Sequence, residues 1–180
     1  ILDIMDELFK HPVQLVVLGS GDPEIEAQLR SAEQRYPRQL SVHVGYDEQL
    51  AHNIEAGADA LLMPSRYEPC GLNQMYSQLY GTIPIAHRTG GLADTVVDFN
   101  QESLAAHQAT GFLFDGDSPE ALLATCLGAL SLYRNDRVDW WKLVIAGMKQ
   151  DFSWTQSARQ YVELYARLVN SRQGDEPEGQ

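Results

Sequence analysis

One stretch organises the sequence: Pro64-Ser65-Arg66-Tyr67-Glu68-Pro69-Cys70-Gly71-Leu72-Asn73-Gln74. The apolar run 60–63 before it is typical of a buried parallel strand. Its two prolines exclude regular structure, because each fixes φ and removes an N–H donor. After it, apolar residues recur at helical spacing from Leu72 to Leu79, and Gly81 ends the pattern. The stretch is therefore predicted to be a loop that leaves a strand and opens a helix.

Such a loop is where open α/β sheets bind ligands. The first N–H groups of a helix have no partner within the helix, and they suit an anion such as a diphosphate. Glu68 is the one carboxylate that this loop can direct at the same place. The loop alone predicts an anion-binding crevice in an α/β domain, for a substrate that it does not identify.

Strand and helix patterns alternate along the rest of the chain. Further strands are expected at 14–18, 40–44 and 82–86, the last one shortened by Pro84, with short apolar edge pieces at 95–98 and 111–114. Helices are expected at 1–9, 23–36, 47–55, 118–132 and 155–169, and in a segment with Trp141, Val144, Ile145 and Met148 on one face.

This alternation predicts an α/β fold, a Rossmann-like parallel sheet with helices on both faces and right-handed crossovers. The helix at 1–9 has no strand before it, so the sheet is expected to lack its first strand. Residues 1–170 are expected to form one Rossmann-like domain with C-terminal helices, and residues 171–180 a disordered acidic tail.

The composition excludes several classes of function. The net charge of −12 disfavours nucleic acid and anionic membranes as partners. No apolar run approaches the roughly 20 residues that span a bilayer. The two cysteines, Cys70 and Cys126, form neither a disulfide framework nor a metal-binding spacing, so a reducing cytosol is the simpler setting. The five histidines are scattered without the spacing of a metal site.

Each candidate residue also has an ordinary structural interpretation. Gly19-Ser20-Gly21 begins like a dinucleotide fingerprint, but Glu24 stands where its third glycine belongs, so a tight turn is the better interpretation. By pattern alone, Glu68 is a solvated carboxylate and Cys70 a small packing residue. Tyr46 suits either a core or a stacking role.

Several sequence blocks occur together, and their joint occurrence points to a family far more specifically than any single block does. The stretch 64–76, then Tyr80-Gly81-Thr82-Ile83-Pro84, then Arg88-Thr89-Gly90-Gly91-Leu92-Ala93-Asp94-Thr95-Val96 closely resemble the bacterial glycogen synthase and plant starch synthase family, in residues and in spacing. Shorter blocks at 18–22, 45–46, 57–59, 111–112 and 151–154 match as well.

The resemblance implies a B-type glycosyltransferase fold, in which two Rossmann-like domains face each other across a cleft. It implies transfer of glucose from ADP-glucose, or UDP-glucose, to the 4-hydroxyl group at the non-reducing end of an α-1,4-glucan, with retention and without a metal or other cofactor. This chain resembles the C-terminal, donor-binding half. The acceptor glucan would bind through the absent N-terminal domain, and the protein would be cytoplasmic.

The family's functional residues carry over to nine positions. Glu68 would lie beside the donor glucose as the catalytic-site carboxylate. The substrate-binding residues would be Tyr46, which stacks on the base, Cys70, Gly71 and Leu72 around the sugar and diphosphate, Asn73 at the phosphate, and Thr89, Gly90 and Gly91 near the sugar.

Two positions depart from related patterns. Tyr76 stands where many retaining transferases have a second Glu, which counts against a sucrose- or mannose-handling transferase of the same fold. Asn73 stands where many bacterial members have Thr, so its phosphate contact stays open.

The family's Arg and Lys that clamp the diphosphate would precede Ile1. The isolated chain is therefore expected to be inactive, and a non-catalytic nucleotide- or glucan-binding module is the alternative.

Overall fold

The computed structural model describes residues 1–173, and the side chains of residues 1–170. Residues 1–149 form one compact unit, and the residues that follow form a second unit, which is described separately. The predicted domain 1–170 therefore extends beyond the compact unit. The predicted tail overlaps the last helix at 171–173, and its residues 174–180 lie outside the described residues.

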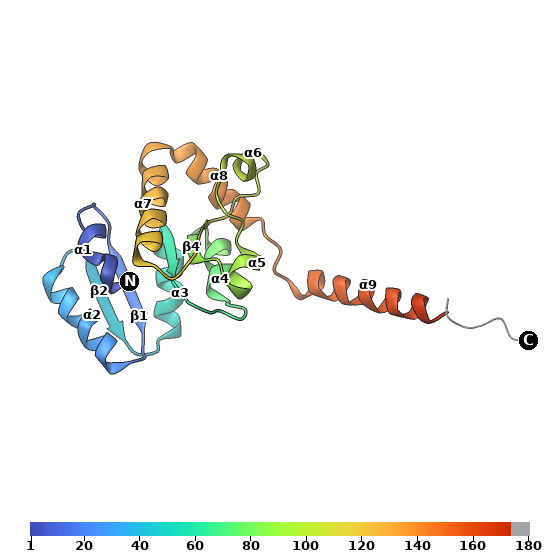
Figure 1. Ribbon diagram of the computed structural model, residues 1–180, viewed down its shortest axis with the longest axis horizontal. Helices are drawn as coiled ribbons and strands as arrows, with labels where there is room; N and C mark the ends of the chain where they lie inside the picture. Colours follow the sequence, from blue (N-terminus) through green and yellow to red (C-terminus); the bar gives the residue numbers. More distant parts are fainter. Residues whose placement is uncertain (174–180) are drawn as a thin grey trace, which may run out of the picture. The chain divides into compact units, whose positions relative to one another are not determined.

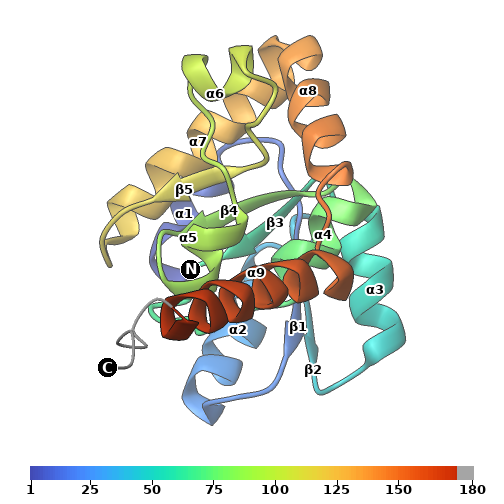
Figure 2. The same cartoon turned by 90° about the vertical axis from the view of Figure 1, so that its right-hand side faces the viewer.

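The strands form two parallel sheets (Figures 1 and 2). In the first sheet, β1 (Leu15–Gly19) pairs with β2 (Leu40–Val44), and Leu15 lies opposite Leu40. In the second sheet, the order is β3 (Ala60–Met63), β4 (Ile83–His87) and β5 (Phe112–Phe114). All three pairings are parallel, as the alternating pattern predicts.

Helices connect these strands. They are η1 (Leu2–Ile4), α1 (Met5–Leu8), α2 (Pro23–Arg35), α3 (Glu48–Gly57), α4 (Asn73–Tyr80), α5 (Gly90–Thr95), α6 (Gln101–Ala105), α7 (Pro119–Asn135) and α8 (Arg137–Met148). Asp22 caps α2 by accepting a hydrogen bond from the N–H of Glu24 at 2.7 Å, and Ser118 caps α7. Gly81 ends α4 in the left-handed conformation (φ 87°), which glycine adopts without steric cost.

Alternate residues of the second sheet face different helices. Ile83, Ile85, Phe112 and Phe114 share a core with residues of η1, α1, α7 and α8. Ala86 and Leu113 point the other way, into a cluster with Leu92 and Val96. The predicted α/β arrangement with helices on both faces is therefore confirmed.

Helix α1 contributes to two cores. Ile4 and Leu8 pack in the core that contains β4 and β5, whereas Met5 and Phe9 pack with residues of α2 and β2. This division keeps the two sheets in one unit although no backbone hydrogen bond of the described residues joins them into one sheet.

Three local predictions differ from the structure. Pro84 does not shorten β4, which is the central strand: its missing N–H would face β5, and the β5 ladder begins only at Ile85. Segment 90–95 is a helix, α5, where the sequence pattern predicted none. The buried face of α8 differs from the predicted one. Trp140 and Leu143 are buried, whereas three of the four residues expected on that face, Trp141, Ile145 and Met148, are about half exposed.

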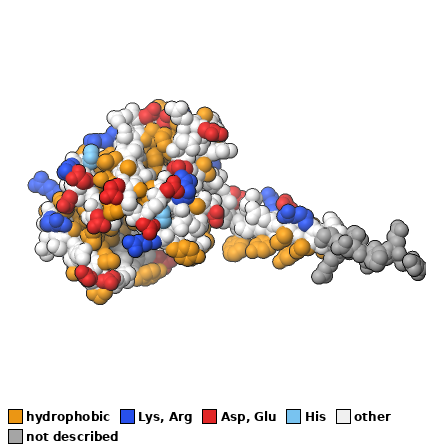
Figure 3. Space-filling view, in the orientation of Figure 1, with side chains coloured by type: hydrophobic (Ala, Val, Ile, Leu, Met, Phe, Trp, Pro, Cys, Tyr) orange, Lys and Arg blue, Asp and Glu red, His pale blue; other side chains and the backbone are white. Residues whose placement is uncertain are grey.

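Helix α9 (Trp154–Gln173) belongs to the second unit. Apolar side chains gather along one side of it (Figure 3), including the exposed Tyr161, Val162, Tyr165, Leu168 and Val169. The predicted helix at 155–169 is confirmed and extends further at both ends.

Candidate functional site

The site is built from two loops that interlock at the carboxyl ends of β3 and β4. The N–H of Gly91 donates to the carbonyl oxygen of Glu68 at 3.0 Å. A Cβ at Gly90 would collide with that same carbonyl oxygen, and a Cβ at Gly91 would collide with the carbonyl oxygen of Cys70. Gly90 also has φ +43°, where side chains are strained. The two glycines are therefore required for the loops to pack against each other.

A buried glutamine holds the same junction. Gln74, fully buried in the first turn of α4, directs its side-chain Nε2 at the carbonyl oxygens of Cys70 (3.0 Å) and Gly71 (3.1 Å) and at Oγ1 of Thr95 (3.0 Å). The hydroxyl of Thr95 in turn donates to the carbonyl oxygen of Gly91 at 2.6 Å. One side chain thus joins the site loop to α4 and α5.

Loop 64–72 ends in a turn that opens α4. Gly71 is left-handed (φ +72°), which fits the sharp entry into the helix. Leu72 is the N-cap residue, and its side chain makes no capping hydrogen bond among the residues described. The N–H of Met75 donates to the carbonyl oxygen of Leu72 at 2.9 Å, so the amides of Asn73 and Gln74 are those that α4 can offer to an anionic ligand.

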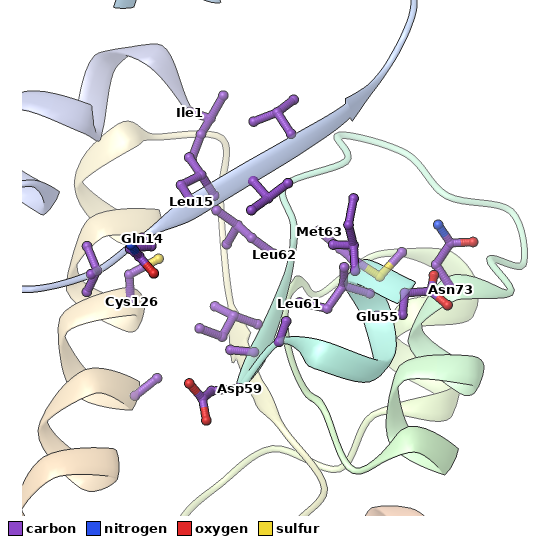
Figure 4. Close-up of a pocket in the computed structure, with 18 of the residues that line it drawn as sticks. Ile1, Gln14, Leu15, Glu55, Asp59, Leu61, Leu62, Met63, Asn73 and Cys126 are labelled. Atoms are coloured by element: carbon purple, nitrogen blue, oxygen red, sulfur yellow. The ribbon is translucent and has the colours of Figure 1, made fainter. Parts of the chain in front are cut away.

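Four of the nine predicted residues line one cavity of about 1600 Å³: Glu68, Gly71, Leu72 and Asn73. Glu68 is half-buried there. Figure 4 shows Asn73 and Met63 toward one end of this cavity. A carboxylate and an uncapped helix start thus border the same space, an arrangement that suits a ligand with hydroxyl groups next to phosphates.

The other five predicted residues do not line this cavity. Cys70 is exposed in the same loop, next to Gly71. Thr89 accepts at its carbonyl oxygen from the N–H groups of Leu92 and Ala93, at the start of α5. Tyr46 follows β2 and is 88% exposed, so its ring is open to stacking, but it does not line the cavity. The structure therefore groups the residues from loops 64–73 and 89–91 and leaves Tyr46 apart.

Arg88, at the end of β4 next to this site, is engaged in ion pairs. Arg88 contacts Asp98 at 2.8 Å and Asp115 at 3.0 Å. The hydrogen bond with Asp98 raises the pKa of the Arg88 guanidinium, although partial burial opposes the shift. Arg88 therefore anchors the end of β4 to neighbouring loops.

The role of Gln74 and Thr95 was missed by the sequence interpretation. Both lie in the quoted blocks, and Gln74, Ser77 and Gln78 are fully buried polar residues within a helix. Polar residues at spacings of three and four on the buried face of a helix were the available signal, because buried polar groups are retained where they are hydrogen-bonded.

In the described part of the chain, no three His, Cys, Asp or Glu side chains lie close enough together to hold a metal ion. Over the same residues, no helix is both long and apolar enough to cross a membrane.

One protein-family model matches most of the chain. Residues 1–140 match the family model described as glycosyl transferases group 1. The chain belongs to this family. The match covers both sheets and both loops of the site, so the interlocked geometry described above belongs to the part that the family shares.

Individual relatives agree with the resemblance found in the sequence. Glycogen synthase 1 of Methylococcus capsulatus is 55% identical over 169 residues, which cover 94% of this chain and 34% of that protein. The glycogen synthase of Thioalkalivibrio sulfidiphilus is 55% identical over 157 residues, covering 87% of this chain and 32% of that protein. The chain thus spans about a third of the length of these curated relatives.

A solved structure supports the fold assignment. The catalytic domain of starch synthase IV from Arabidopsis thaliana, bound to ADP and acarbose, is 36% identical with a TM-score of 0.81, covering 93% of this chain and 35% of that chain. Sucrose-phosphate synthase from Thermosynechococcus elongatus, at 23% identity and a TM-score of 0.65, shows the fold alone. The expected glycogen and starch synthase resemblance and the B-type fold are confirmed.

Proposed function

We propose that this chain is the donor-binding half of a glycogen or starch synthase. The whole protein would transfer glucose from ADP-glucose to the non-reducing 4-hydroxyl group of an α-1,4-glucan, with retention of configuration. The observation that carries this proposal is the position of Glu68 beside the uncapped start of α4, in a chain that is 55% identical to glycogen synthases.

The roles of the residues follow from the geometry. The departing nucleoside diphosphate gains negative charge, and fixed amide dipoles at the start of α4 stabilise that charge without rearranging. Asn73 lies at the same helix start and would contact the phosphate. Glu68 would bind hydroxyls of the donor glucose and stabilise positive charge on the sugar ring. Tyr46 would stack on the adenine base, and no metal ion would be needed.

The interlocked loops would act through preorganisation. Gln74 and Gly91 hold the backbone of residues 68–71 against α5. Rigid positioning of the carboxylate relative to the helix start keeps both groups aligned with one ligand. Thr89, Gly90 and Gly91 would contact the sugar from the second loop.

The isolated chain is proposed to bind donor without catalysing synthesis, because the acceptor glucan would bind to a domain outside these residues. The neighbour from Arabidopsis is bound to ADP, which supports ADP over UDP as the nucleotide here. A cytoplasmic location goes with this function. Detectable glucan elongation by the pure chain would contradict the proposed inactivity.

Titration calorimetry tests this proposal. The chain should bind ADP more tightly than UDP. Glu68→Gln should weaken binding of ADP-glucose by about tenfold, the loss expected for one charged hydrogen bond, and leave ADP binding unchanged. Glu102→Gln, which removes the same charge from an exposed position on α6, is the matched control. No heat with ADP at millimolar concentration would contradict a nucleotide site in this half.

A further inference from the structure

Loop 64–72 leads from the end of β3 to α4, and its two halves are held by different groups. The second half is fixed by the N–H of Gly91 and by the buried side chain of Gln74. The first half begins with Pro64, which has no N–H to donate. This half leads into Glu68, so the group that holds it bears on where that carboxylate lies.

A histidine side chain holds the first half of the loop. His87 is the last residue of β4, and its Nδ1 lies 2.8 Å from the carbonyl oxygen of Ser65. Because a carbonyl oxygen can only accept, Nδ1 carries the hydrogen and donates it to Ser65. The other ring nitrogen, Nε2, lies 4.0 Å from Oδ1 of Asp117, which is beyond hydrogen-bonding distance.

The ring of His87 is fixed by packing. It stacks on Phe114 of β5, with the ring centroids 5.3 Å apart and 24° between the two planes, and the His87 side chain is only 12% exposed. A hydrogen bond shielded from water is electrostatically stronger than an exposed one, and removing its donor leaves the carbonyl oxygen without that partner. His87 is therefore a rigid donor that fixes Ser65 relative to β4 and β5.

The side chains that follow this hydrogen bond border different spaces. Glu68 lines the cavity of about 1600 Å³, whereas Arg66 lines a second, smaller cavity of about 130 Å³. Because the peptide group that joins Ser65 to Arg66 is planar, holding its carbonyl oxygen also fixes its N–H. A rotation of this peptide group would change the directions of the side chains after it, and the hydrogen bond from His87 opposes that rotation.

We propose that His87 is a positioning residue of the donor site, which sets the direction of the Glu68 carboxylate by holding the carbonyl oxygen of Ser65. His87 has this role only under the proposed function, in which Glu68 binds the donor glucose. His87 does not line the larger cavity, so it acts through the loop and not by touching the ligand. A carboxylate held in one direction keeps its hydrogen bonds to the sugar aligned.

Two substitutions separate the hydrogen bond from the packing of the ring. His87→Phe keeps an aromatic ring against Phe114 but has no donor. His87→Asn lacks the ring but carries its amide nitrogen at about the place of Nδ1, so it can still donate to the carbonyl oxygen of Ser65. A positioning role requires the donor, whereas a packing role requires the ring.

Titration calorimetry with ADP-glucose measures the effect on binding. His87→Phe should lower the affinity by about fivefold, the loss expected for one hydrogen bond, and His87→Asn should stay within about twofold of the natural chain. Any result in which His87→Asn binds ADP-glucose no better than His87→Phe would overturn the proposal, because the ring and not the donor would then matter.

Amide shifts of the isotopically labelled, ligand-free chain test the contact without the nucleotide. The N–H of Arg66 belongs to the same peptide group as the carbonyl oxygen of Ser65, so its nitrogen shift reports that hydrogen bond. The amides of Arg66 and Glu68 should shift in His87→Phe and return toward their natural positions in His87→Asn. Unchanged shifts in His87→Phe would overturn the proposal. If the natural chain did not bind ADP-glucose, the proposed function would fail, and these shifts would still decide whether His87 positions the loop.

Discussion

The two edges of β3 differ in how complete they are. On the β4 side, strands are paired and the following loops interlock so closely that Gly90 and Gly91 have no room for a Cβ. On the β1 side, the same strand borders an apolar cavity. The contrast shows that residues 68–74 and 89–95 are fixed by contacts within this chain, whereas the other edge of β3 is unpaired among the described residues.

The largest expected effect comes from closing the space on the complete side. Gly91→Ala should destabilise the fold by about 3 kcal/mol, because its Cβ would meet the carbonyl oxygen of Cys70. Gly128→Ala is the matched control: it lies in α7 with no atom within 4 Å of its Cβ and should stabilise by about 1 kcal/mol. Urea unfolding of both variants measures the difference. Equal effects would contradict the interlocked loops.

A smaller loss is expected from the glutamine that joins the loops. Gln74→Leu should cost about 2 kcal/mol, because carbonyl groups of Cys70 and Gly71 lose a donor. It should also weaken ADP binding, since loop 68–71 would no longer be fixed. Gln49→Leu, at an exposed position of α3, should change stability by less than about 0.5 kcal/mol. Thermal unfolding and ADP titration of both variants provide the test. Unchanged ADP affinity in Gln74→Leu would contradict the claim that the hydrogen bonds of Gln74 position loop 68–71 for nucleotide binding.

The smallest effect is expected at the cavity that borders the unpaired edge of β3. Glu55 lines the cavity, and burial raises its carboxyl pKa, against the opposing influence of His52. Because its folded pKa exceeds the unfolded value, the stability that Glu55 contributes is present below the unfolded pKa and is lost as pH rises through the folded pKa. Glu55→Gln should therefore gain stability relative to the natural chain between pH 4 and pH 8, by less than about 1 kcal/mol. Urea unfolding across this range would contradict the account if the difference shrank as pH rose.

The sequence predicted what depends on local chemistry. Gly81 as a helix end and the apolar run 60–63 as a strand are both confirmed, because each reports a preference of its own segment. Pro84 and helix α5 were misjudged because tertiary context decided them: the β5 ladder starts after Pro84, and the glycines of α5 are fixed by contacts with residues 68–70.

The candidate site shows the same division. The motifs identified Glu68, Gly71 and Asn73, and the structure brings them to one cavity. Gln74 was not recognised, because its contact with Thr95, 21 residues further along the chain, forms only on folding. The face of α8 was assigned to the wrong residues because Trp140 and Trp141 are adjacent, and only packing decides which of the two is buried.

The most direct test of the proposed donor site is a chemical-shift map of the isotopically labelled chain during titration with ADP. The account predicts that the amides of Gly71, Asn73 and Gln74 shift together and saturate with one dissociation constant, while amides in the last turn of α2, which does not line that cavity, stay unchanged. Shifts confined to other elements, or none at about 10 mM ADP, a concentration that reveals even millimolar affinity, would contradict the placement of the nucleotide at the start of α4.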